Sequence, residues 1–586
     1  MNKSSKSPNL RIVIAIAAAL VVIVIWSKYF APDETNTHHT STNTTKDAKL
    51  ASAETKESTS INSAPAIAKQ TDALKNNTKS VPNLAKDSPD STLLTIKSKE
   101  FDMDIDSLGR IKQVYLKDPK FTHPPQEHFL EHVKRLVGIV KGEQKQLDRL
   151  PIFANDASPK PLEVRFANED LNALAFKTPY KLETSSEALK ERILNLGKTP
   201  VSIVLTQTLG KLEITKTLLI NPNLTYTVTI HTSEPVKYLL SNGARPTADG
   251  ENYAFNGVLL EKASGSIEKI EDGDAKKEGE AYPNSTFVAS VDRYYTTLLY
   301  SKNNLDVIVG QQATGKKLPM SFIDVQKQDV TFSGYIGPKY YSTLHSIDPK
   351  LTNVIEYGMI TFFAKYVFWL LNFLHGYVGN WGFAIILVTL IIRIILFPLT
   401  YKGMVGMQKL KELAPKMKEL QAKHKGEPQK LQAAMMELYK KNGANPVGGC
   451  LPLVLQIPVF FGIYRVLYNA VELKSASFIF WIHDLSVMDP YFVLPIIMGL
   501  SMYLQQTLSP TPVTDPTQAK IFKLLPVVFT IFLITFPAGL VLYWTVNNIF
   551  SALQQLAINK ILAAKKAKFA LKHGEKEVIK EEKKHK

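Results

Sequence analysis

The sequence predicts a polytopic α-helical membrane protein, with an N-terminal anchor and a five-helix core, that carries a large all-β sandwich domain outside the membrane. Three observations lead to this fold class. Residues 91–350 consist of short runs in which polar and apolar side chains alternate, whereas five long apolar segments follow after residue 380. The basic residues, 70 Lys and Arg against 53 Asp and Glu overall, cluster beside the apolar segments. The length of 586 residues is also too great for a single domain.

Residues 1–30 form the predicted anchor. Three basic residues precede a continuous apolar run from Ile12 to Trp26, which is the pattern of a secretory signal. Because no clear small-x-small cleavage site follows, we expect an uncleaved transmembrane helix with its N-terminus in the cytoplasm. Removal of the segment is the alternative. Residues 31–90 are rich in Ser, Thr, Asn, Lys and Ala and are predicted to be a flexible linker, since such a composition buries too little surface to fold.

Residues 91–350 are predicted to form an antiparallel β-sandwich domain. Strands are expected at six alternating runs, over residues 93–97, 101–105, 111–116, 202–208, 211–220 and 224–231. Turn-forming residues separate these runs, for example Ser107-Leu108-Gly109 and Asn221-Pro222-Asn223.

Two motifs in this region resemble ligand sites but depart from them. Gly310 to Lys317 nearly spells a P-loop, yet Lys317 stands where Ser or Thr must hold magnesium, and Leu318-Pro319 follow where a helix should begin. Three histidines, His123, His128 and His132, have spacing typical of metal ligands, but no carboxylate pattern completes the site, so we interpret them as surface residues. We therefore expect no cofactor, no metal and no catalytic residues.

The segment 351–376 is predicted to be an amphipathic helix that lies in the membrane interface. Its polar residues Thr361, Lys365, Asn372 and His375 fall in one narrow stripe at 100° per residue. A spanning helix is the alternative, and it would place Lys365 in the middle of the membrane.

The core is predicted over residues 377–562. Its spans are expected at 381–401, 447–470, 491–508, 522–536 and 540–558.

A cytoplasmic helical hairpin is predicted over residues 402–445, between the first two spans. Apolar residues are spaced for two packed helices: Met407, Leu410, Ala414 and Met417 on the first, and Leu431, Met435 and Leu438 on the second. Ten lysines in this loop, together with a basic tail over 563–586, place both segments inside the cell by the positive-inside rule. The hairpin is either a solvated orienting element or a docking surface, whose residues would be Lys409, Lys411, Lys416 and Lys418.

Arg393 is the candidate functional residue of the core. It lies 8 residues before Tyr401, about 12 Å from the cytoplasmic end of the span. A buried charge there costs about 2.5 to 3.5 kcal/mol on insertion scales, so it should face protein or water. No Asp or Glu occurs within the five spans, which indicates a wet cavity lined by amides and hydroxyls; snorkelling to inner-leaflet phosphates is the alternative. The candidate lining residues are Thr389, Gln456, Gln505, Gln506, Asn547 and Asn548.

Several stretches closely resemble the YidC/Oxa/Alb family of membrane protein insertases, in its Gram-negative form with a large periplasmic domain. The resemblance covers roughly Ile355 to Leu562 and rests on stretches such as GNWGFAIILVTLIIR, NPVGGCLPLVLQIPVF and FPAGLVLYWTVNN. It implies a hydrophilic groove that is open to the cytoplasm and to lipid, with Arg393 as the groove arginine. Substrates would slide along positions matching Thr389 and Trp544, beside Tyr543; well-studied members of the family carry tyrosine at the Trp544 position.

The resemblance further implies a function and partners. The protein would insert, fold and help assemble integral membrane proteins in the inner membrane, alone or with the Sec translocon. Ribosome and targeting-receptor contacts would use the hairpin and tail, with no specific nucleic-acid sequence recognised. Both termini would be cytoplasmic and the large domain periplasmic. No ATPase or hydrolase constellation is present, so we expect no enzyme. A polytopic transporter or a membrane-anchored periplasmic receptor is the alternative.

Overall fold

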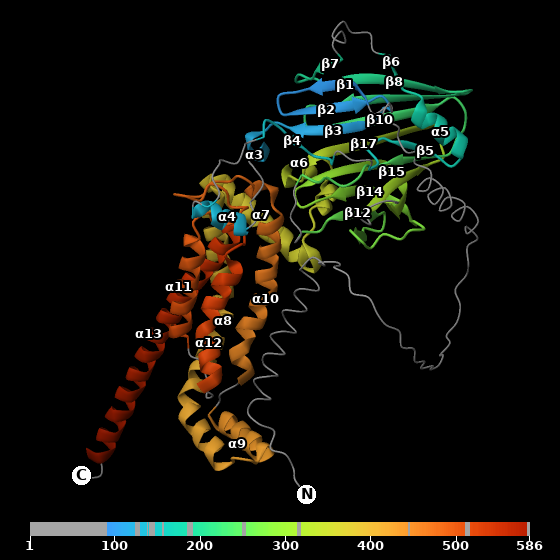
Figure 1. Ribbon diagram of the computed structural model, residues 1–586. Coiled ribbons are helices and arrows are strands. Elements are labelled where there is room, and N and C mark those ends of the chain that lie inside the picture. The colour runs from blue at the N-terminus through green and yellow to red at the C-terminus, as the bar shows by residue number, and fades with distance from the viewer. Residues whose placement is uncertain are drawn as a thin grey trace, which may run out of the picture. The chain divides into compact units, whose positions relative to one another are not determined.

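The chain folds into two units, shown in Figure 1 as a computed structural model. The structure describes residues 91–122, 129–137, 139, 147–154, 158–183, 192–248, 254–312, 318–442, 446–509 and 516–582. The β-rich unit contains residues up to Thr122 and those from Leu147 to Ile355, and the helical unit contains residues 129–139 and those from Glu356 onward. The predicted anchor over 1–30 and linker over 31–90 lie outside the described residues, as do His123, His128 and the last four residues of the tail.

The β-rich unit consists of two sheets, which confirms the predicted β-sandwich. The first sheet has five strands in the order β4-β3-β2-β1-β7. Their bounds are β1 Thr92–Lys97, β2 Phe101–Asp106, β3 Ile111–Leu116, β4 Leu150–Pro151 and β7 Ile193–Asn195. All pairs are antiparallel except the parallel pair β1 and β7. The predicted turn is present: Gly109 adopts a φ of 63°, and its amide donates to the carbonyl of Asp106.

The second sheet has twelve strands, nine of them in the order β13-β12-β14-β15-β17-β10-β9-β8-β6. Three further strands attach to it, with β11 paired to β16 and β5, and β16 also paired to β15. Their bounds are β5 Val164–Phe166, β6 Lys181–Leu182, β8 Val201–Leu209, β9 Leu212–Ile220, β10 Thr225–Thr232, β11 Tyr238–Ser241, β12 Gly257–Lys262, β13 Ile267–Glu271, β14 Glu280–Val291, β15 Tyr295–Gln311, β16 Pro319–Val325 and β17 Asp329–Pro338.

The central strand β9 shows why the alternating sequence forms this sheet. Every second residue of β9 is buried, among them Leu212, Ile214, Leu218 and Ile220. The same inward series contains Lys216, which is completely buried although its side chain is basic. The β-rich unit therefore buries the basic side chain of Lys216 at a position where the alternation of β9 predicts an apolar residue.

The P-loop-like segment belongs to a β-hairpin. Gly310 and Gln311 end β15, and Pro319 begins β16, which pairs antiparallel with β15 through Gln311 and Pro319. Residues 313–317 lie outside the described residues. A strand thus follows where nucleotide binding would require a helix.

Short helices accompany the strands, and longer ones form the helical unit. In the β-rich unit these are α3 Pro119–Thr122, α5 Glu169–Lys177, α6 Tyr341–Ile347 and the 3-10 helix η2 Pro349–Val354. The helical unit contains α4 Phe129–Leu136, η3 Gly358–Ile360, α7 Thr361–Val378, α8 Trp381–Lys423, α9 Pro428–Lys441, α10 Pro446–Asn469, η4 Val471–Leu473, α11 Val493–Leu508, α12 Pro516–Leu533 and α13 Ala538–Glu582.

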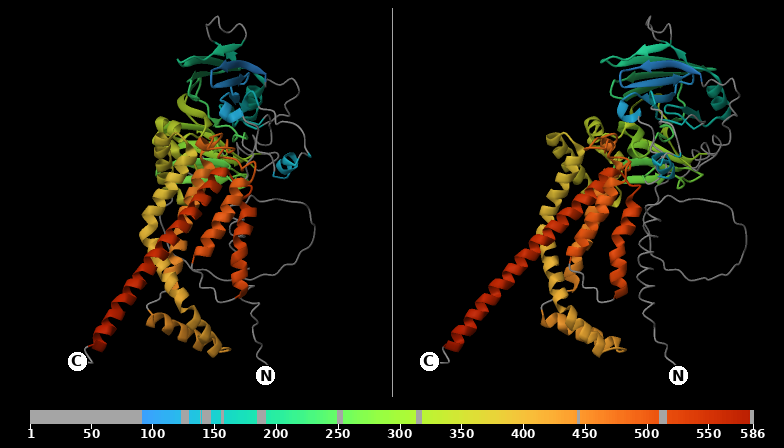
Figure 2. Two further views of the ribbon diagram at one scale, coloured as in Figure 1. Left: turned by 90° about the vertical axis from the view of Figure 1, so that its left-hand side faces the viewer. Right: turned by 60° about the vertical axis from the view of Figure 1, so that its left-hand side comes forward.

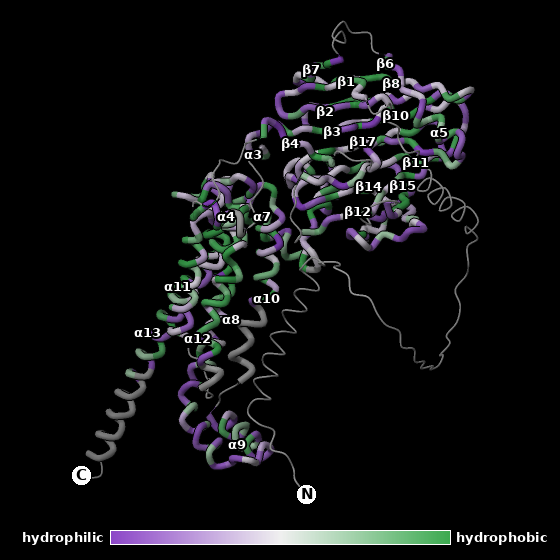
Figure 3. Tube along the Cα trace, viewed as in Figure 1, coloured by the Kyte–Doolittle hydropathy of each residue, from purple (hydrophilic) through white to green (hydrophobic). Residues whose placement is uncertain are grey.

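Two helices of this unit are much longer than a single span. The helix α8 continues without a break from the first predicted span into the hairpin, and α13 continues from the last predicted span into the basic tail (Figure 2). Among the described residues, α8 is the helix with a stretch long and apolar enough to cross a membrane, and α11 is a shorter apolar helix. In Figure 3 the hydrophobic colour of α11, α12 and the first turns of α8 gives way to a mixed, more hydrophilic colour at the far end of α8.

The start of α8 is set by a pair of residues. Gly379 ends α7 in the left-handed conformation, with a φ of 64°, and its amide donates to the carbonyl of His375. Asn380 then caps α8 by accepting from the amide of Phe383, while its own amide group donates to the carbonyls of Ser477 and Phe478. The loop before α11 is therefore tied to the first turn of α8.

The apolar residues of the hairpin agree only in part with the predicted spacing. Leu410 and Met417 of α8 are buried together with Leu413, which was not predicted, and Met435 and Leu438 of α9 pack against them. Ala414 and Leu431 are not part of this cluster. The four predicted docking lysines are all exposed, at positions 409, 411, 416 and 418. The apolar side chains of α8 and α9 thus pack against one another, and the four lysines are exposed outside this contact.

Two predicted domain boundaries differ from the structure. The helix expected from residue 351 begins ten residues later, at Thr361, because residues 349–354 form η2 and Gly358, with a φ of 76°, turns the chain before α7. The β-domain predicted as continuous over 91–350 is interrupted, since the described residues 129–137 and 139 belong with the helical unit, and it extends to Ile355. Whether α7 lies in the interface stays a prediction.

Candidate functional site

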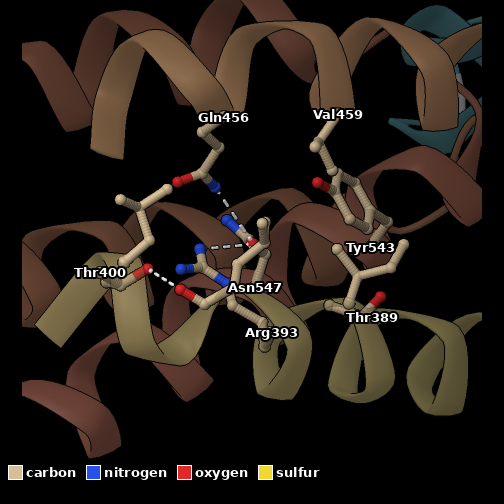
Figure 4. Close-up of a pocket in the computed structure, with 10 residues that line it drawn as sticks. Thr389, Arg393, Thr400, Gln456, Val459, Tyr543 and Asn547 are labelled. Atoms are coloured by element: carbon tan, nitrogen blue, oxygen red, sulfur yellow. Dashed lines mark hydrogen bonds between the residues drawn. The ribbon is translucent and has the colours of Figure 1, made fainter. Parts of the chain in front are cut away.

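A pocket opens among α8, α10 and α13 around Arg393 (Figure 4). Its empty space is about 420 Å³, part of which is open to solvent. Three helices line it: Thr389, Ile392, Arg393, Leu396, Leu399 and Thr400 come from α8, Gln456 and Val459 from α10, and Tyr543 and Asn547 from α13. Helices distant in the sequence thus surround the arginine with mixed apolar and polar groups.

Asn547 is the hydrogen-bond partner of the arginine. Arg393 donates from Nε to Asn547 Oδ1 at 2.8 Å and from Nη2 to the same oxygen at 2.5 Å. Gln456 donates to this oxygen as well, from Nε2 at 3.3 Å. One amide oxygen therefore accepts from three donors. These hydrogen bonds connect Arg393 on α8 to Asn547 on α13 and, through the same oxygen, to Gln456 on α10.

The charge of Arg393 has no carboxylate partner among the described residues. Its side chain is only 8% exposed, and the residues that line the pocket include no Asp or Glu. The other arginine of the core helices, Arg465, has Nη1 4.0 Å from Oε2 of Glu356, so this second charge is paired within the unit. An amide oxygen compensates a positive charge only partly. The pocket therefore keeps a net positive character.

The α8 side of the pocket follows helical spacing. Thr389, Arg393, Leu396 and Thr400 lie at i, i+4, i+7 and i+11 and form one stripe. The hydroxyls of Thr389 and Thr400 donate to the carbonyls four residues earlier, those of Ile385 and Leu396. The sequence prediction did not include Thr400, although the stripe through Arg393 would have indicated it.

The predicted lining residues divide into two groups. The structure brings Thr389, Gln456, Tyr543 and Asn547 together with Arg393, whereas four other candidates lie outside the pocket. Asn548 donates to the hydroxyl of Ser501 on α11, and Gln506 donates to the carbonyl of Phe522. The ring of Trp544 packs against Phe460 and Phe529, and Gln505 does not line the pocket either.

The remaining histidine of the metal-like trio has another role. His132 lies on α4 and donates from Nε2 to the carbonyl of Pro490 at 2.9 Å. Within the described part of the chain, no three His, Cys, Asp or Glu side chains are grouped so that they could hold a metal ion.

A second buried charged cluster lies in the β-rich unit. Arg110 forms ion pairs with Asp106 at 2.7 Å and with Glu163 at 2.8 Å, and Arg165 pairs with Glu163 at 2.7 Å. Lys216 Nζ donates to two backbone carbonyls, those of Gly109 and Leu162. Burial lowers the pKa of Lys216 to about 7. Burial alone would raise the pKa of Glu163, but the two guanidinium groups hold it below its usual value.

Comparisons with known proteins show the family. The family described as "60Kd inner membrane protein" matches residues 373–566, and the family described as "YidC periplasmic domain" matches residues 161–370. A protein of Helicobacter pylori named "Membrane protein insertase YidC" is 53% identical over 565 residues, which cover 95% of this chain and 97% of the relative. Proteins with the same name from Wolinella succinogenes and Campylobacter jejuni are 49% and 43% identical, each over at least 94% of both chains.

These matches extend over both units and over almost the full length of the relatives. They support the insertase interpretation over a transporter or a periplasmic receptor, and they agree with a helical core that carries a periplasmic β-sandwich. The chain belongs to the YidC family of membrane protein insertases, whose members are polytopic proteins of the inner membrane with a periplasmic domain.

Proposed function

We propose that this protein inserts membrane proteins through the pocket around Arg393. The observation that carries the proposal is the arginine itself, which is 8% exposed and has a single amide oxygen as its partner. Keeping an unpaired charge in such a place is costly, so a use for the charge is the simplest reason for its presence. A polar or acidic segment in transit would provide the missing negative charge.

The steps follow from the lining of the pocket. The polar, often acidic, outer segment of a nascent protein enters from the cytoplasm, and Arg393 lowers the cost of removing that segment from water. Thr389, Tyr543 and Gln456 offer further polar groups along the three helices. The apolar neighbour of the segment then partitions into lipid, and the membrane potential acts on the acidic residues. No bond is made or broken in these steps.

The cytoplasmic hairpin is the proposed docking surface. Lys409, Lys411, Lys416 and Lys418 are exposed on α8, while its apolar side is occupied by α9. A cluster of exposed lysines is complementary in charge to ribosomal RNA or to an acidic targeting receptor. The basic tail on α13 would add to it, and the Sec translocon would be a partner at the helical core.

The proposed topology follows from the positions of the basic segments. The hairpin and the end of α13 lie in the cytoplasm, the β-rich unit lies in the periplasm, and the predicted anchor starts in the cytoplasm. The spans are those at 381–401, 447–470, 491–508, 522–536 and 540–558. The helix predicted over 351–376, which corresponds to α7, lies in the periplasmic interface.

The test is insertion in cells depleted of their own insertase and supplied with this chain. Two clients are compared that differ only in their outer segments, one with Asp and Glu and one with Asn and Gln. We expect the wild type to insert both, Arg393→Ala to lose the acidic client selectively, and Arg393→Lys to keep it.

If Arg393→Ala at normal expression inserts neither client, Arg393 has a role in folding, and the proposed role of its charge is contradicted. Failure of the wild type with every client would contradict the proposed function itself. Lys211→Ala, at an exposed position in the turn between β8 and β9, serves as a control for a changed charge outside the pocket and the hairpin, and it should leave the difference between the two clients unaltered.

A further inference from the structure

The β-rich sequence contributes one helix, α4, to the helical unit. The described residues 129–137 and 139 lie between two β-domain segments in the sequence but belong to the unit that contains α8 to α13 (Figure 1). His132 of α4 donates to the carbonyl of Pro490, and its ring meets the edge of Phe492 with the centroids 5.7 Å apart. These contacts hold α4 against the residues that lead into α11.

In the topology proposed above, this contact lies at the periplasmic end of the core helices. Phe492 immediately precedes Val493, the first residue of α11. The chain leaves the periplasmic β-domain at Ile355, and the next residue, Glu356, accepts at its carbonyl from Asn469, which ends α10. The end of α10 therefore lies where the chain enters the helical unit from the β-domain, at Glu356. Tyr491, which precedes Phe492 and is 58% exposed, is of a residue type that is common at a membrane interface.

Apolar residues follow His132 at the end of α4. His132 and Leu136 are spaced i and i+4 on one side of the helix, which ends at Leu136, and the amide of Ile139 just beyond it donates to the carbonyl of Lys134. Whereas His132 is packed, Leu136 is 51% and Ile139 is 71% exposed, and the neighbouring Val137 is 63% exposed. Single exposed apolar residues are ordinary, but three within four positions form a patch that needs an apolar neighbour.

We propose that the end of α4 is a lipid anchor, with Leu136, Val137 and Ile139 inserted at the headgroup and acyl boundary of the periplasmic leaflet. The patch lies about one helical turn beyond His132, whose contacts with Pro490 and Phe492 hold α4 to the residues before α11. In the proposed topology, lipid surrounds the core helices at this level. Lys134, exposed on the same helix and followed by Arg135 in its last turn, complements lipid phosphates. The anchor would fix the periplasmic domain to the membrane surface at a point separate from its chain connection at residue 355. The proposal rests on the proposed topology but not on how Arg393 acts.

The experiment measures contact with lipid at single positions of the full chain. Cys450 is the only cysteine, so a Cys450→Ala background lets single cysteines be labelled with an environment-sensitive fluorophore. The labelled variants are Leu136→Cys, Val137→Cys and Ile139→Cys, and the control is Lys211→Cys, which is exposed in the turn between β8 and β9. Each protein is reconstituted in vesicles of phosphatidylethanolamine and phosphatidylglycerol that contain a lipid with a shallow nitroxide.

We expect quenching at the three α4 positions to exceed that at Lys211→Cys severalfold, together with a blue shift of the emission. Quenching equal to the control would overturn the proposal. Cross-linking between copies through these cysteines without quenching would also overturn it, since the patch would then be covered by a second copy of the chain. A doubly substituted protein with Leu136→Ser and Ile139→Ser, labelled at Val137→Cys, provides an independent check, because it should lose most of the quenching while its circular dichroism is unchanged.

Discussion

Replacing Asn547 by aspartate should neutralise the pocket while leaving its shape almost unchanged. The carboxylate would occupy the place of an amide oxygen that already lies 2.8 Å from Nε and 2.5 Å from Nη2 of Arg393. Two opposite charges about 4 Å apart attract by about 4 kcal/mol at an effective dielectric constant near 20. An acidic client would have to compete with this internal ion pair.

We expect Asn547→Asp to lower insertion of an acidic client by at least tenfold, which corresponds to about 1.4 kcal/mol of the attraction. A client whose outer segment carries Asn and Gln instead should be inserted as by the wild type. Asn547→Leu separates charge from hydrogen bonding, because it removes the acceptor but leaves Arg393 positive. That variant should insert the acidic client within a few-fold of the wild type.

The assay is protease protection of the two clients in insertase-depleted cells that express each variant at equal level. A matched control is Asn548→Asp, the same chemical change one residue further along α13, where the side chain faces Ser501 and not the arginine. If Asn547→Asp inserts the acidic client normally, or if Asn548→Asp shows the same charge selectivity, the role assigned to the charge of Arg393 is wrong.

Three further predictions concern stability. The pKa of Lys216 is about 7 in the folded chain against 10.5 normally, so between these values the unfolded chain binds more protons and the unfolding free energy should rise by about 1.4 kcal/mol per pH unit. Hydrogen exchange of β9 amides at pH 7, 8 and 9 should show this slope in the wild type and not in Lys216→Met. A Cβ atom on Gly382 would lie 2.0 Å from the ring of Phe478, whereas one on Gly406 meets nothing. Gly382→Ala should therefore lower stability in detergent by about 1 to 3 kcal/mol, and Gly406→Ala should not. Leu413→Ala removes part of the apolar contact between α8 and α9, and should speed hydrogen exchange in α9, with a loss of about 2 to 5 kcal/mol, while α11 stays unchanged.

Local patterns in the sequence were sufficient for much of the fold. Strands β1, β2, β3, β8, β9 and β10 were predictable because alternating burial requires alternating side chains, and the turn at Gly109 requires a residue that tolerates positive φ. The hairpin was predictable for the same kind of reason, since Leu410 and Met417 repeat at helical spacing. Arg393 was predicted as a candidate site residue because a charge in an apolar span is costly wherever its partners lie.

The partners of that charge required the tertiary structure. Sequence composition proposed six polar residues around Arg393, but nothing local distinguishes Asn547 from Asn548, which face different helices because successive residues are 100° apart. Gln505 and Gln506 are equally polar but lie on α11, away from α8. The direction of each side chain depends on how α8, α10, α11 and α13 are rotated against one another.

The sequence by itself therefore determined six of the strands, the helical hairpin and the apolar segments that form the core helices, and it singled out Arg393 as a charge within one of them. Only the tertiary structure decided that Asn547 and Gln456 meet Arg393, and that α4 leaves the β-domain to contact Pro490, 358 residues away in the chain from His132. The physical reason is that secondary structure follows the periodicity of neighbouring residues. These contacts instead depend on how distant segments pack, and the sequence of each segment does not specify which other segment it will meet.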